Sequence, residues 1–144
     1  MQTETQTRTV PASKAALWAG RTLSGLAVLF LLVDALMKVA MMAPVVEACG
    51  PLEIPLRVVP GLGVVLLVAT LIYAVPPTAV LGAVLLTGYF GGATWTHIRM
   101  GGPVFPMVFP SLVATFLWGG LLLREPRLRA LFPVRRRVAL TPTE

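Results

Sequence analysis

The chain has 144 residues, of which 56% are hydrophobic and 12% charged, and its formal net charge is +6. Soluble domains carry about 25% charged residues, so this composition and a mean hydropathy of +0.83 exclude an ordinary soluble domain and indicate a membrane protein. Six of the twelve lysines and arginines lie between Arg124 and Arg137. A basic segment beside an apolar body is typical of a cytoplasmic flank, and we expect no nucleic-acid partner.

The first 14 residues are polar and are predicted to form a disordered tail. The first apolar stretch begins near Ala15, and its uninterrupted run, 22–33, has the size of the hydrophobic region of a cleaved signal peptide. Against cleavage, apolar residues resume beyond Lys38, and no A-x-A-like site follows Val33 directly. We therefore predict an uncleaved first membrane span.

Three further apolar runs are each long enough to cross a bilayer, which needs about 20 residues: they cover residues 58–75, 78–96 and 104–123. Pro76 and Pro77 end the second span. Pro106 and Pro110 are predicted in the first turns of the last span, where a missing amide donor matters least. The longest connection is predicted over 42–57.

The distribution of basic residues predicts the orientation. Three precede the first span and six follow the last, whereas the first and third connections hold one each, Arg57 and Arg99. Both termini are therefore expected in the cytoplasm, which requires an even number of spans. We predict an all-α, polytopic four-helix transmembrane bundle over 15–132. The basic tail 133–144 is expected to bind anionic lipid headgroups.

The third span is rich in glycine, and Gly88 with Gly92 forms a GxxxG step. Small residues let helix backbones approach closely within a membrane. We expect this step to serve packing inside the bundle, with a homodimer through Gly88 and Gly92 as the alternative.

Asp34 and Lys38 are two charged residues inside the first apolar segment. A spacing of four places them on one face of a helix, one turn apart. Each charge within the hydrocarbon costs roughly 3 kcal/mol on insertion scales, which a leucine at either position would avoid. We therefore expect the pair to form a polar site that faces the interior of the bundle.

Other polar groups are predicted near this pair, because the first and third spans both run outward. Glu47, His97 and Arg99 share the outer leaflet with Asp34 and Lys38, and the cytoplasmic halves of the spans are expected to hold no titratable group. Each residue has a structural alternative. The pair can be a neutralised clamp, His97 an interfacial residue, Arg99 a snorkelling side chain and Glu47 a loop charge.

Several chemistries are excluded. Cys49 is the only cysteine, so no intramolecular disulfide or CxxC motif exists, and a single histidine cannot supply a His-rich metal site. The chain contains no Walker sequence, no HExxH and no GxSxG. We expect no metal site, and any redox chemistry must come from a bound partner or ligand.

Six segments together are characteristic: 34–38, 45–48, 70–73, 78–89, 91–93 and 96–99. Through them the chain resembles the DoxX-like family of small four-span membrane proteins over roughly residues 17–132. The resemblance implies a four-helix membrane bundle. Relatives are linked by name to thiosulfate–quinone oxidation or to quinone-responsive membrane complexes, but this chain has no cysteine motif for sulfur transfer.

These observations lead to one favoured function and two alternatives. We favour a pocket, open toward the outer leaflet, that binds a small lipophilic ligand, with a quinone as the candidate cofactor. Tyr89, Trp95 and Trp118 are expected in packing or in the interfacial belts, and one of them could line the cavity. The candidate ligand-binding residues are Asp34, Lys38, Glu47, Tyr89, His97 and Arg99.

The first alternative is an enzyme in which His97, Asp34 or Glu47 acts as acid and base on a lipophilic substrate. Lys38 or Arg99 would then stabilise the developing negative charge. The second alternative is a non-catalytic scaffold for a redox partner, and a proton-coupled carrier is a weaker one. In each case the expected location is a cell membrane, with several spans, and the bacterial inner membrane in particular.

Overall fold

A computed structural model describes residues 14–125 and residue 128. Within these residues the chain is helical and contains no strand. Four of the helical segments are long and apolar enough to cross a membrane, which confirms the predicted four-span bundle. The predicted tail 133–144 lies outside the described residues, as does the predicted N-terminal tail except for Lys14. The elements are α1 (Lys14–Val39), α2 (Ala43–Cys49), η1 (Leu56–Val58), α3 (Val59–Ala74), η2 (Pro76–Thr78), α4 (Ala79–Arg99) and α5 (Val104–Arg124).

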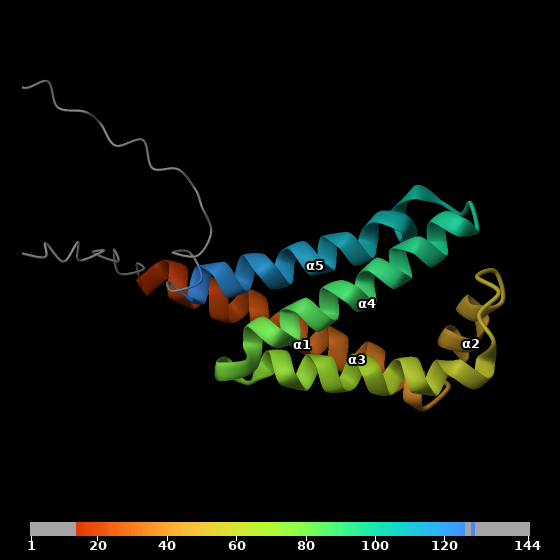
Figure 1. The fold of residues 1–144 in the computed structure, drawn as a ribbon, viewed down its shortest axis with the longest axis horizontal. Helices are drawn as coiled ribbons and strands as arrows, with labels where there is room; N and C mark the ends of the chain where they lie inside the picture. Colours follow the sequence, from red (N-terminus) through yellow and green to blue (C-terminus); the bar gives the residue numbers. More distant parts are fainter. Residues whose placement is uncertain (1–13, 126–127, 129–144) are drawn as a thin grey trace, which may run out of the picture.

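The four long helices form an antiparallel bundle (Figure 1). Helix α1 packs against α3 and α5, and α4 packs against the same two helices. One end of the bundle holds the start of α1, the η2 turn and the end of α5, and is called the terminal end below. The opposite end, called the loop end, holds α2 and the turn between α4 and α5.

The helices differ from the predicted ones in three respects. Helix α4 continues through His97 to Arg99, and the predicted connection 42–57 contains the short helix α2, which has a proline in its first positions. The expectation that a missing amide donor matters little at Pro110 was wrong, because this residue lies inside α5, beyond its first turn. Its missing amide leaves the carbonyl of Pro106 without the usual helical donor.

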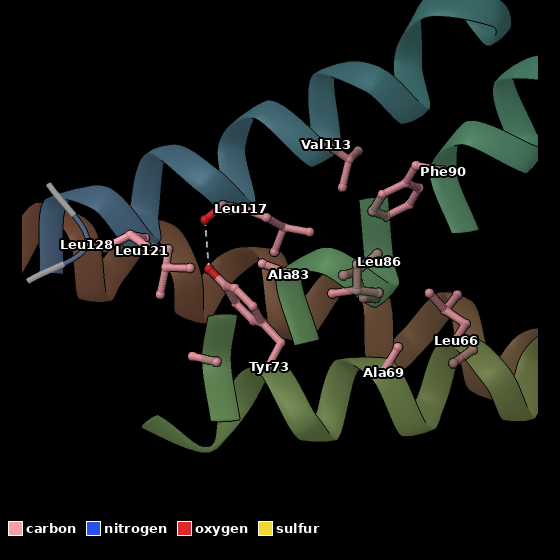
Figure 2. Close-up of a cluster of buried hydrophobic side chains, with 13 residues drawn as sticks. Leu66, Ala69, Tyr73, Ala83, Leu86, Phe90, Val113, Leu117, Leu121 and Leu128 are labelled. Atoms are coloured by element: carbon pink, nitrogen blue, oxygen red, sulfur yellow. Dashed lines mark hydrogen bonds between the residues drawn. The ribbon is translucent and has the colours of Figure 1, made fainter. Parts of the chain in front are cut away.

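Tyr73, near the end of α3, joins the helices at the terminal end (Figure 2). Its hydroxyl donates to the carbonyl oxygen of Leu117 in α5 at 2.9 Å, and it lies 3.0 Å from Ser24 Oγ of α1. Since a phenol has one hydrogen, Ser24 is the donor in the second bond. Tyr73 is fully buried, and the Arg124 guanidinium lies over its ring, 5.1 Å from the centroid. The terminal half thus holds a titratable side chain, contrary to the prediction.

Gly82 of α4 makes close packing against Tyr73 possible. A Cβ added to Gly82 would lie 2.7 Å from Tyr73 Cβ and closer still to its backbone. Because backbone atoms cannot move aside as a flexible side chain can, only glycine fits here. Helix α4 therefore meets the same residue that binds α1 and α5.

The expected role of Gly88 and Gly92 inside the bundle was wrong. A Cβ added to either residue would meet nothing within 4 Å, and both are exposed. The homodimer through these two glycines stays a prediction.

Replacing Tyr73 by phenylalanine should lower the free energy of unfolding by about 1–3 kcal/mol, because the Ser24 hydroxyl and the Leu117 carbonyl lose their buried partner. The matched control is Tyr89→Phe, since Tyr89 makes no hydrogen bond among the described residues. Thermal unfolding in detergent measures both. Equal losses in the two variants would contradict the role given to Tyr73.

Two glycines of α4 provide a second matched pair. Gly82→Ala should destabilise the protein by about 1–3 kcal/mol through overpacking against Tyr73. Gly88→Ala should be neutral or stabilising by up to about 1 kcal/mol, because alanine is the better helix former and has free space there. Unfolding curves that rank the two variants the other way would disprove the close contact.

Candidate functional site

The charged pair of α1 continues the interior stripe of that helix. Ala27, Leu31, Asp34 and Lys38 follow one another at steps of four, three and four residues, which is one face of a helix. Leu31 is fully buried. The side chains of Asp34 and Lys38 keep only 33% and 22% of their exposure, so both are partly buried. Lys38 Nζ donates to Asp34 Oδ1, as the spacing predicts.

Gly63 of α3 makes room for the lysine. A Cβ added to Gly63 would lie 2.9 Å from Lys38 Cβ. The stem of Lys38 therefore lies against the first turns of α3, and its ammonium group reaches back one turn to Asp34. Sequence reasoning missed Gly63, because nothing in the sequence relates it to a residue 25 positions earlier.

Helix α4 carries a similar stripe that becomes polar toward the loop end. Leu86, Phe90, Ala93 and His97 follow one another at steps of four, three and four residues. Phe90 is the last buried residue of α4. Beyond it, α4 and α5 diverge from α1 and α3 (Figure 1). The half-buried His97 thus lies on the interior face of α4, in the open half of the bundle.

A groove of about 310 Å³ lies between α3 and α4. Tyr89 supplies its only polar side chain, and the other lining residues are Val64, Val65, Val68, Ala69 and Leu85. The Tyr89 hydroxyl has no hydrogen-bond partner in the part of the chain that the structure describes. The groove therefore combines apolar walls with one hydroxyl that has no hydrogen-bond partner among the described residues.

The remaining candidates lie at the same end but are not joined to the pair. Glu47 on α2 and Arg99 at the end of α4 are exposed. Neither they nor His97 make a hydrogen bond or an ion pair with any residue in 14–125. Trp95 is exposed, and the Trp118 indole donates to Thr87 Oγ1 at 2.9 Å, which links α5 to α4.

A second groove, of about 460 Å³, lies between α1 and α5. Its lining residues are all apolar: Leu23, Leu26, Ala27, Phe30, Phe105, Phe109, Leu112, Val113 and Phe116. Such a surface can hold a hydrocarbon chain but offers no side-chain group that would orient a polar head. Within the described residues, no three histidine, cysteine, aspartate or glutamate side chains are placed to hold a metal ion.

Removing one charge of the pair should be worse than removing both. Asp34→Leu leaves the Lys38 ammonium unpaired, and we expect a loss of about 3 kcal/mol or failure to insert. Asp34→Leu with Lys38→Leu should recover yield and thermal stability, because leucines suit the membrane interior. The comparison uses expression level and the unfolding midpoint in detergent. A double variant less stable than the single one would show that the pair has additional partners.

Comparison with known families gives a match over most of the bundle. A family model described as the DoxX-like family matches residues 22–120, which is more than half of the chain. The matched range contains the Asp34–Lys38 pair, Tyr73, Gly82 and the groove between α3 and α4. Comparison with curated proteins and with solved structures found no match. The chain belongs to the DoxX-like family and is a multi-pass membrane protein.

Proposed function

We propose that this member of the DoxX-like family binds a small lipophilic molecule in the groove between α3 and α4. The polar head of the ligand lies toward Tyr89 and the Asp34–Lys38 pair. One observation carries the proposal: the single polar side chain of an apolar groove is a hydroxyl without a hydrogen-bond partner among the described residues. Apolar walls with a few convergent polar groups are the usual composition of a small-molecule site.

The size of the groove favours a ring-sized head group. Its volume of about 310 Å³ is near the lower limit of typical ligand pockets, which measure about 300–1,000 Å³. A quinone fits this description, because a flat apolar ring carries its oxygen atoms at the edge and its tail can extend into the surrounding lipid. We therefore propose a quinone-type ligand and a place in a membrane redox system.

The charges of the described residues support an orientation with the terminal end in the cytoplasm. Lys14, Arg21 and Arg124 lie at that end, where Glu125 is the only acidic residue among those described. Positive charge accumulates on the cytoplasmic side of membrane proteins. In a bacterial inner membrane, the open half of the bundle then faces the outer leaflet, from which a lipophilic ligand can enter.

The acid–base enzyme has less support than ligand binding. It requires a proton path between His97 and either Asp34 or Glu47, and no hydrogen bond among the described residues connects them. Binding requires only the groove and the polar groups beside it.

Filling the groove should abolish binding without unfolding the protein. Val65→Phe introduces a larger side chain into the lining, and we expect at least a tenfold loss of affinity, about 1.4 kcal/mol. The probe is a short-chain alkyl benzoquinone in its oxidised and reduced forms, and the measurement is the ligand-dependent rise of the unfolding midpoint in detergent.

The matched control is Val80→Phe, since Val80 is an exposed residue of α4 that lines neither groove. It should bind the probe as the unaltered protein does. Unchanged binding by Val65→Phe, or no binding of either form of the probe by the unaltered protein, would rule out this site.

A further inference from the structure

We propose that the terminal end of α1 binds one anionic phospholipid. Its phosphate lies between Lys14 and Arg21, and one of its acyl chains lies over Gly25. This site is separate from the groove between α3 and α4 and does not depend on the function proposed above. It follows from four residues of α1 that share one exposed face.

These residues form a stripe along the helix, which consists of Lys14, Trp18, Arg21 and Gly25. Its steps of four, three and four residues correspond to one face of a helix. All four residues are exposed. The buried residues of α1 lie on a different face: Gly20, Ser24, Leu31 and Ala35. The stripe therefore faces the lipid and not the interior of the bundle.

Helix α1 is long enough to carry the stripe into the headgroup layer. It has 26 residues, and at 1.5 Å per residue it is about 39 Å long, whereas the hydrocarbon core is about 30 Å thick. The first turns of α1 therefore reach the level of the lipid phosphates, where tryptophan is also enriched. Gly25, about three turns further along, lies at the level of the acyl chains.

The polar groups of the stripe have no acceptor among the described residues. The Arg21 guanidinium lies over the Trp18 ring, 6.0 Å from its centroid, so the arginine side chain extends back toward Lys14. Neither cation forms an ion pair with a described residue, and the Trp18 indole N–H makes no hydrogen bond with one. This also holds for Glu125, the only acidic residue described at that end. Two cations and an indole donor favour an anionic acceptor, which a lipid phosphate provides at this depth.

Gly25 gives the acyl chain a place beside the two cations. A Cβ added to Gly25 would meet nothing within 4 Å, so the missing side chain leaves the helix backbone open to lipid. Leu29, four residues further along, is exposed as well. A chain that runs from the phosphate across Gly25 to Leu29 thus contacts apolar atoms along its length. A basic patch alone would attract any anionic surface, whereas the glycine selects a molecule with a chain attached to its phosphate.

Native mass spectrometry of the full chain, released from detergent, tests the proposal. The probes are phosphatidylglycerol and phosphatidylethanolamine with identical acyl chains, titrated separately. The first phosphatidylglycerol should bind about fivefold more tightly than the first phosphatidylethanolamine, because the ammonium group of the second lipid cancels its phosphate charge. Equal affinities, or a protein dimer in place of the lipid-bound monomer, would overturn the proposal.

Variants assign the bound lipid to the stripe. Arg21→Gln and Lys14→Gln should each weaken phosphatidylglycerol binding about fivefold. The matched control is Arg57→Gln, which removes an exposed cation at the loop end and should leave the affinity unchanged. Gly25→Leu should weaken both lipids by the same factor, because the leucine occupies the path of the chain and leaves the charges in place. If Arg57→Gln weakens binding as much as Arg21→Gln does, or if Gly25→Leu binds as the unaltered protein does, the proposal is wrong.

Discussion

The bundle depends on the buried side chain of Tyr73, at which four helices meet. Its hydroxyl bonds to Ser24 of α1 and to the Leu117 carbonyl of α5, while its backbone lies against Gly82 of α4. Lipid offers no water to replace a lost hydrogen bond and no hydrophobic drive for helices to associate. Close packing and satisfied polar groups must therefore hold the spans together, and Tyr73 supplies both at the terminal end.

Because Tyr73 holds the four helices together at the terminal end, the candidate site lies toward the loop end. The interior stripe of α4 is apolar as far as Phe90, and on α1 the charged residues Asp34 and Lys38 flank the fully buried Ala35 toward the loop end. In that half the two helix pairs diverge (Figure 1), and the groove between α3 and α4 is open at the surface. The charges of Asp34 and Lys38 are costly in hydrocarbon. In the function proposed above, they orient the polar head group of the ligand.

Much of the fold could be predicted from the sequence, because bilayer thickness sets the span length and a step of four residues places Asp34 and Lys38 together. The packing contacts could not be predicted in this way. Ser24, Tyr73 and Leu117 are far apart along the chain, and only the tertiary structure brings them into one hydrogen-bonded group. Gly82 and Gly88 look alike in the sequence. Gly82 lies on the face of α4 that contacts α3, whereas Gly88 lies on an exposed face. The GxxxG step therefore pointed to the wrong glycine.

Photo-crosslinking tests the central claim, that the open half of the bundle binds a lipophile between α3 and α4 and not between α1 and α5. A photoactivatable alkylphenol is bound to the protein in nanodiscs, irradiated, and its adducts are mapped by peptide mass spectrometry. We predict adducts at 64–69 and 85–89 that an excess of unlabelled alkylphenol suppresses. Competed adducts concentrated at Phe30, Phe109 and Phe116, in the groove between α1 and α5, would contradict the account.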